Sequence, residues 1–348
     1  MTVKIQSSAV GKIWLKKIIR LAIALVIYLT FAFSLYSPHF RSFERTDYLI
    51  VFNGILASSG CYILSSRWIS SFWAKLFTGS LYGFGPFMIG LVKFHPAVGM
   101  LAGLIPWAFL PAAFCPIKRW KFLPWLLSVI PFLMIVTFFN LAAWLGFFPA
   151  SIQYRLQASD LISLFAPVVA SNTDSILMGF YHVPVGALVI GVSMLLISRR
   201  WGIMIIFILG LIGAVVPSII NISPLLWLTI PSLCLAVLVG EGIQGLARAG
   251  FSDRRWVFLT MVIMGLLAMS ALFFATTYFQ EFAGLGDKYA KALVQAAKMY
   301  ILGAVSVTII FFMIRARVRL YWLRLAVLCS AMAIDIYLSS QLLVDKTL

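Results

Sequence analysis

Charged residues are scarce in this chain, and their scarcity excludes an ordinary soluble protein. Only 11% of the 348 residues are Asp, Glu, Lys or Arg, 63% are hydrophobic, and the mean hydropathy is +1.04. A water-soluble core cannot hold so large an apolar fraction, so the solvent around most of the surface must be lipid. The composition therefore predicts an all-α integral membrane protein. No soluble domain or linker interrupts residues 1–348, which we treat as one polytopic domain.

Disulfide, metal and cofactor motifs are also missing. The four cysteines have no paired spacing, which favours small buried hydrophobes over a disulfide framework or a metal site. There is no Walker loop, dinucleotide glycine fingerprint, HExxH, GxSxG or CxxC pair. The net charge is +17, but the cations stand between apolar runs and do not form one patch. This arrangement is typical of transmembrane-helix flanks and speaks against nucleic-acid binding.

Apolar runs of the length that a bilayer demands recur along the chain. Residues 1–20 form a basic head, and with the first run we interpret them as an uncleaved signal-anchor. The prolines within the runs are expected to kink or break helices. About eleven transmembrane helices are predicted: Leu21–Tyr36, Tyr48–Ser65, Ser70–Val92, Ala97–Phe114, Phe122–Phe148, His182–Ile197, Trp201–Ile220, Pro224–Ile243, Trp256–Tyr278, Met299–Ile314 and Tyr321–Val344.

The distribution of charge predicts the orientation. With the N-terminus inside, most of the 27 Lys and Arg residues fall in the inside segments, and each inside loop is short and basic. The C-terminus is then outside. Most of the ten acidic residues and all three histidines fall outside, so recognition or chemistry is expected on the outer face. We expect the protein in a bacterial inner membrane.

The longest water-facing stretch, residues 149–181, is expected to organise the outer face. It contains a ten-residue apolar piece, Leu161–Ala170, which is too short to cross and should be interfacial or re-entrant. Polytopic proteins build ligand sites where the backbone leaves regular helices. The candidate substrate-binding residues in and beside this loop are Arg155, Asp160, Asp174 and His182.

The first outer loop, Ser37–Asp47, gathers charges of both signs. Glu44 and Asp47 are the candidate catalytic residues, since two carboxylates this close could supply a general base or ligands for a divalent cation. Arg41 and Arg45 are candidates for binding a phosphate. The alternative is an interfacial turn in which these charges pair with one another.

Asp335 is predicted near the bilayer midplane, about 16 Å from the cytoplasmic Arg324. An acid at this depth is costly if ionised and unpaired. It is either a substrate or proton contact, or it makes a hydrogen bond to a neighbouring helix, with Asn53 and Asn140 as candidate partners.

Three stretches then suggest a family. They are Ala74–Phe84 followed by His95–Pro96 and Pro106; Phe180–Tyr181 with Gly186; and Pro224–Leu246 with its internal Pro231 and glycines. Their spacing resembles bacterial GT-C-type membrane glycosyltransferases over about residues 50–250. The resemblance implies transfer of a sugar from a polyprenyl-phosphate carrier at the outer leaflet, with the catalytic acid in the first outer loop.

That loop is short here, whereas the family has a long one with interfacial helices. Three functions therefore stay open: glycosyl transfer, a non-catalytic integral subunit of a larger membrane complex, and a transporter or flippase using Asp335. The expected partners are membrane lipids, a polyprenyl-phosphate carrier and other membrane subunits. A divalent cation is the candidate cofactor.

Overall fold

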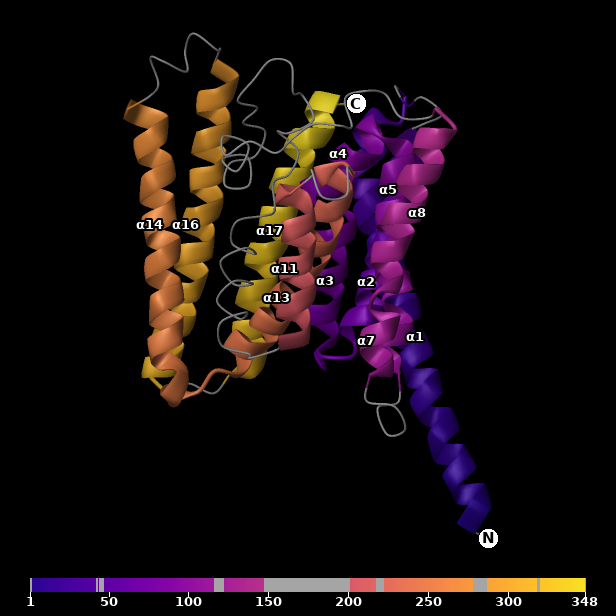
Figure 1. Ribbon diagram of the computed structural model, residues 1–348. Helices are drawn as coiled ribbons and strands as arrows, with labels where there is room; N and C mark the ends of the chain where they lie inside the picture. The colour runs from indigo at the N-terminus through magenta and orange to yellow at the C-terminus, as the bar shows by residue number, and fades with distance from the viewer. Residues whose placement is uncertain are drawn as a thin grey trace.

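The computed structural model describes residues 2–41, 43, 47–115, 122–146, 201–216, 222–277, 287–317 and 320–347. Every regular element in these ranges is a helix, as the composition predicts (Figure 1). Six helical segments among them are long and apolar enough to cross a membrane, the property of a multi-pass membrane protein. The helices are α1 (Thr2–Tyr36), η1 (Ser37–His39), α2 (Asp47–Ser65), α3 (Phe72–Gly83), α4 (Pro86–Phe94), α5 (Pro96–Ala108), α6 (Leu110–Phe114), α7 (Leu123–Leu127), α8 (Ile130–Trp144), α11 (Trp201–Val215), α13 (Pro224–Arg248), η5 (Phe251–Asp253), α14 (Arg254–Thr277), α16 (Asp287–Arg315) and α17 (Tyr321–Thr347).

Three of the predicted spans are each divided into two helices. The structure forms α3–α4, α5–α6 and α7–α8 where single spans were expected over Ser70–Val92, Ala97–Phe114 and Phe122–Phe148. In each pair the second helix has a proline in its first two positions: Pro86, Pro111 and Pro131. Proline lacks the N–H that a continuing helix needs, but it fits the first turn of a new one. The proline expectation is confirmed here. Pro96–Phe114 and Leu123–Trp144 are each still one candidate span, whereas the span expected over Ser70–Val92 is divided into two shorter helices.

The break between α3 and α4 leaves backbone groups inside the helix bundle. Gly85 is extended, with φ −67° and ψ 154°. The carbonyl oxygen of Phe84 accepts a 2.6 Å hydrogen bond from the hydroxyl of Ser340 on α17. An unsatisfied carbonyl is costly where water is absent, so this bond stabilises the break and ties α17 to it.

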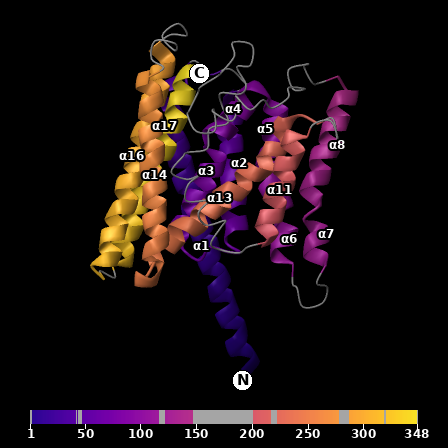
Figure 2. The same cartoon turned by 60° about the vertical axis from the view of Figure 1, so that its left-hand side comes forward.

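The helices α2, α3, α5 and α13 form a tightly packed seam. α2 packs against α3 and α5, and α13 packs against α3 on one side and α11 on another (Figure 2). A Cβ on Gly83 of α3 would overlap the carbonyl oxygen of Gly54 and lie 2.7 Å from the backbone nitrogen of Ser58 on α2. Small residues let helix backbones approach this closely in membranes.

The pair α14 and α16 stands at the edge of the molecule. These two helices pack extensively against each other, and α16 packs against α17 (Figure 1). The helix α16 begins at Asp287, so the predicted span Met299–Ile314 is the second part of one longer helix.

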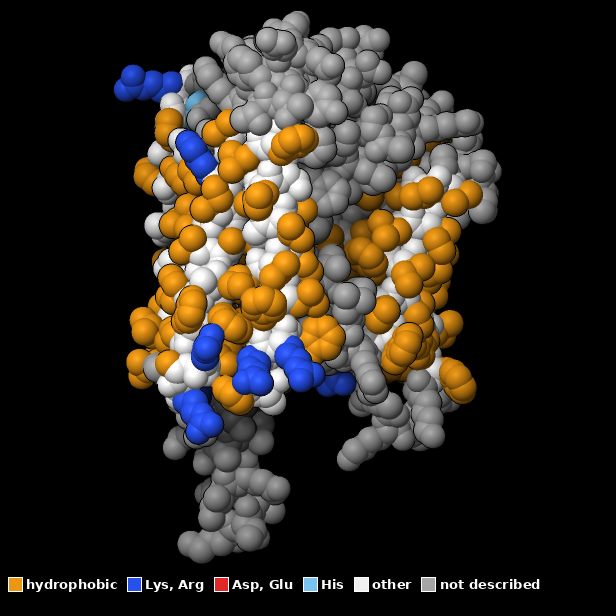
Figure 3. Space-filling view, turned by 90° about the vertical axis from the view of Figure 1, so that its left-hand side faces the viewer, with side chains coloured by type: hydrophobic (Ala, Val, Ile, Leu, Met, Phe, Trp, Pro, Cys, Tyr) orange, Lys and Arg blue, Asp and Glu red, His pale blue; other side chains and the backbone are white. Residues whose placement is uncertain are grey.

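The basic turns gather at one end of the molecule. The α13–α14 and α16–α17 connections lie at the end where the N-terminus projects, opposite to the C-terminus (Figure 1). Figure 3 shows most Lys and Arg side chains of one face near that end, below a belt of apolar side chains. This grouping agrees with the charge pattern. The count of eleven spans and the cytoplasmic side stay predictions, and the span His182–Ile197 lies outside the described residues.

Candidate functional site

In the turn predicted to face outward, Asp47 holds two helices together. Asp47 begins α2, is 2% exposed, and forms a 2.6 Å ion pair with Lys93 near the end of α4. Arg41 is exposed, while Glu44 and Arg45 lie outside the described residues. This ion pair joins the start of α2 to the end of α4. The described contact of Asp47 is therefore structural.

Aromatic rings reinforce the same turn. The ring of Phe43 lies 5.2 Å from that of Phe40, 5.4 Å from that of Tyr48 and 6.2 Å from that of Tyr36, all near edge-on. Such edge-to-face contacts are favourable, and Tyr and Phe commonly sit at the headgroup level of a membrane protein. The rings support an interfacial turn, the alternative open from the sequence.

The residues predicted in and beside the long outer loop are not placed. Arg155, Asp160, Asp174 and His182 lie outside the described residues. Among the residues that the structure describes, no group of three or more His, Cys, Asp or Glu side chains gathers as metal ligands would. The candidate divalent cation stays a prediction.

Asp335 lies at a helix interface. It is 3% exposed on α17 and interacts electrostatically with Tyr300 of α16. The two asparagines expected as its partners direct their amide groups elsewhere. Asn53 donates to the carbonyl oxygen of Gly99 at 3.0 Å, and Asn140 donates to Val136 on its own helix. The neighbour of Asp335 is thus Tyr300, which was not identified from the sequence. The two residues lie where α16 packs against α17, the contact that attaches the α14–α16 pair to α17.

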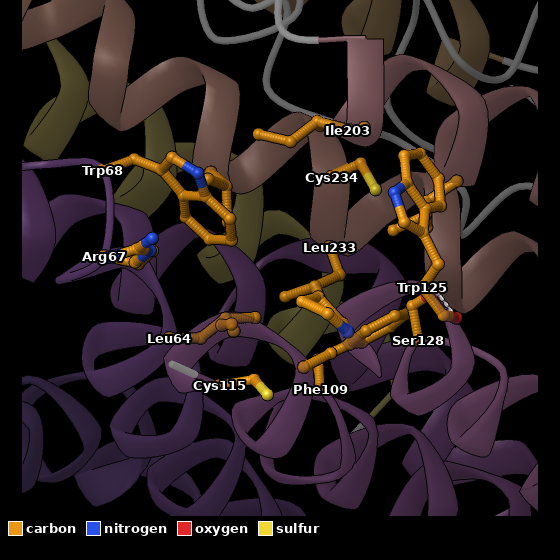
Figure 4. A pocket seen from close by; sticks show the side chains of 16 residues that line it. Leu64, Arg67, Trp68, Phe109, Cys115, Trp125, Ser128, Ile203, Leu233 and Cys234 are labelled. Carbon is orange, nitrogen blue, oxygen red and sulfur yellow. Dashed lines mark hydrogen bonds between the residues drawn. The ribbon is translucent and has the colours of Figure 1, made fainter. Parts of the chain in front are cut away.

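A cavity of about 560 Å³ opens beside α13, between α6, α7 and α11 (Figure 4). Most of the side chains around it are apolar. Those that carry no polar atom include Leu64, Phe109, Ile203, Ile206, Leu233 and Val237. This volume lies in the range of small-molecule sites, and the apolar lining suits a hydrocarbon group. The cavity is therefore our candidate functional site.

Polar groups around the cavity are few and lie on two sides of it (Figure 4). Arg67 and Trp68, from the turn after α2, lie side by side, and Trp125 of α7 lies across from them (Figure 4). Arg67 is exposed, so its guanidinium is accessible beside the apolar space. The hydroxyl of Ser128 donates to the carbonyl of Trp125 at 2.6 Å. One cation and two indole rings at the edge of an apolar space can hold an anionic group above a hydrocarbon chain.

Two thiols also line this cavity. Cys115 follows α6 and is partly exposed, and Cys234 of α13 is 7% exposed. All four cysteines are free thiols, and Cys61 is fully buried, as expected for small hydrophobes. The cavity position of Cys115 and Cys234 gives them a use as chemical reporters.

Arg67 stands in one of the short basic loops that the charge pattern places inside, but the sequence did not identify the cavity. The signal present was the adjacent Arg67–Trp68 pair at the end of a span, a pattern typical of the headgroup level. No protein-family model, curated protein or solved structure is significantly similar to this chain, so the glycosyltransferase resemblance stays a prediction.

Proposed function

We propose that this multi-pass membrane protein binds an amphiphile with a hydrocarbon chain and an anionic headgroup. The observation that carries the proposal is the 560 Å³ apolar cavity with Arg67 at its edge. The chain of the amphiphile occupies the apolar space, and its headgroup accepts hydrogen bonds from the guanidinium. Hydrogen bonds from arginine to phosphate are stronger than those between neutral groups.

The position of the cavity supports a ligand that comes from the bilayer. The helices α6 and α7 lie toward the end of the molecule that carries the basic turns (Figure 2). Indole rings favour the level of the headgroups, and Trp68 and Trp125 both line the cavity. An amphiphile in the leaflet would have its polar group at this level and its chain beside the cavity. From the charge pattern we propose that this level belongs to the inner leaflet of a bacterial inner membrane.

A polyprenyl phosphate has the required chemistry, and it is the carrier that the sequence resemblance implies. We propose binding of such a molecule and not sugar transfer. Asp47, the member of the predicted catalytic pair that the structure describes, is held by Lys93. This favours the role of a binding subunit or carrier of the lipid over that of a transferase.

The proposal is tested by native mass spectrometry of the full chain with added polyprenyl phosphate. Arg67→Gln should weaken binding about tenfold or more, because a charged hydrogen bond contributes on the order of 1.5–3 kcal/mol. Gly202→Leu should also weaken binding. Gly202 lines the cavity, and a Cβ there would meet no atom within 4 Å, so the larger side chain can enter the space without displacing a neighbour.

The matched control is Gly265→Leu on α14. A Cβ at Gly265 also meets nothing within 4 Å, but this residue does not line the cavity. Equal binding by the wild type, Arg67→Gln and Gly202→Leu would contradict the proposal. A loss of binding in Gly265→Leu as large as that in Gly202→Leu would show a general effect on the protein.

A further inference from the structure

Two guanidinium groups converge on one aromatic ring at the basic end of the molecule. The Cζ of Arg254 lies 4.4 Å from the ring centroid of Phe251, and the Cζ of Arg317 lies 5.4 Å from it. Both distances are measured to the same ring centroid. The separation of the two Cζ atoms is therefore at most the sum of these two distances. That separation is comparable with a Debye length of about 10 Å at 0.1 M salt, so the like charges repel with incomplete screening.

Several contacts fix this arrangement. Arg324, which is 5% exposed, donates from Nη1 to the carbonyl oxygen of Ala249 at 2.7 Å and joins α17 to the α13–α14 turn. The Cζ of Arg248 lies 6.0 Å from the ring centroid of Tyr321, which joins the same two regions again. The two turns are therefore held together independently of Arg254 and Arg317.

No acidic side chain in the described part of the chain forms an ion pair with either guanidinium. Asp253 is adjacent to Arg254 in sequence, but its carboxylate accepts the backbone N–H of Gly250 at 2.9 Å. Arg254, Arg317 and the Phe251 ring, which is 44% exposed, all reach the surface. The positive charge of this pair is thus open to an anion from outside the described chain.

We propose that Arg254 and Arg317, around Phe251, bind the phosphate of an anionic phospholipid. Guanidinium groups bind phosphate oxygens with paired hydrogen bonds, and one phosphate between them would relieve their repulsion. A lipid is the fitting source, because Trp256 is 48% exposed and Trp322 is 71% exposed near these turns, and exposed tryptophans are typical of the headgroup level. This site is separate from the cavity, which these residues do not line.

The test compares phosphatidylglycerol with phosphatidylcholine and with inorganic phosphate, using native mass spectrometry of the full chain. The wild type should retain phosphatidylglycerol about tenfold more tightly than phosphatidylcholine, and millimolar inorganic phosphate should not displace it. The variant Arg254→Gln/Arg317→Asn should lose this preference. Asn is chosen because Arg317 has a φ of +56°, a left-handed conformation that Asn tolerates.

The control Arg255→Gln/Arg315→Gln removes the same charge from the same two regions, and neither residue contacts a ring or an acid in the described chain. It should keep the preference. An equal loss in this control would show diffuse attraction and overturn the site, as would an unchanged preference in the first variant. Displacement by inorganic phosphate would assign the site to free anions.

A second variant, Arg254→Lys/Arg317→Lys, preserves both charges in case the first variant fails to fold. It should show a reduced preference for phosphatidylglycerol, because lysine lacks the paired donors of arginine. An unreduced preference in this variant would also overturn the site.

Discussion

The two sides of α13 differ in how much space they leave. Toward α3, a Cβ on Gly240 would overlap the hydroxyl of Thr78, so not even a methyl group fits. Toward α11, Leu233, Cys234 and Val237 of the same helix face a cavity of about 560 Å³. One helix thus borders a tightly packed contact on one side and the cavity on the other.

This difference separates the region that stabilises the fold from the region that is open to a ligand. Apolar side chains gain little by leaving lipid, so helices in a membrane associate through close backbone approach and buried hydrogen bonds. The seam supplies both: Tyr82 donates to Ala102 at 2.7 Å, and Asn53 donates to Gly99 at 3.0 Å. We infer that this rigid side positions α13, so that the cavity can stay open without loss of the fold.

The largest effect expected from this comparison is that of Gly83→Ala. The added Cβ would meet backbone atoms of α2, which cannot rotate away as a side chain could. We expect destabilisation of about 3 kcal/mol or more, at the upper end for overpacking, seen as a lower thermal unfolding midpoint in detergent.

Gly265→Ala on α14 is the matched control, because its Cβ would meet no atom within 4 Å. It should be neutral or slightly stabilising, since alanine favours a helix by up to about 1 kcal/mol over glycine. Equal midpoints for the two variants would mean that the seam is not tight.

A smaller effect is expected for Ser340→Ala, which removes the donor to the carbonyl of Phe84 at the α3–α4 break. The cost should be about 1 kcal/mol, the typical value of one such hydrogen bond in a membrane protein. Ser270→Ala is the control, because its hydroxyl bonds only to Leu266 on its own exposed helix. The account of the break is wrong if Ser340→Ala unfolds no earlier than Ser270→Ala.

Sequence patterns predicted the helical elements well where hydropathy alone determines them. The span Tyr48–Ser65 is α2 within one residue, and Tyr321–Val344 lies within α17. Prolines within the runs were expected to kink or break helices, and Pro86, Pro111 and Pro131 each stand in the first two positions of a new helix. Hydropathy does not show whether a proline bends a helix or starts a new one, and Pro231 lies inside a helix that continues. Neighbouring groups such as Ser340 decide this, and they are distant in sequence.

The candidate site was less predictable. Carboxylates in the predicted outer loops were chosen as candidate catalytic residues because acids are rare in this chain. The structure shows that Asp47 pairs with Lys93, 46 residues away in sequence. The cavity requires α6, α7, α11 and α13 to meet, and no local pattern reports that these helices leave space between them. The position of Arg67 in the sequence helps to predict orientation in the membrane. Its proposed role in binding an anionic headgroup depends on the residues that surround it in three dimensions.

The most direct test of the proposed cavity is alkylation of its cysteines by a small maleimide, followed by mass spectrometry of each cysteine. Polyprenyl phosphate should slow the reaction of Cys115 and Cys234 severalfold, and the neutral polyprenol should protect less, because it offers no anion to Arg67. Cys329, which is partly exposed and does not line the cavity, should react at an unchanged rate. Unchanged rates at Cys115 and Cys234, or equal slowing at Cys329, would contradict amphiphile binding in this cavity.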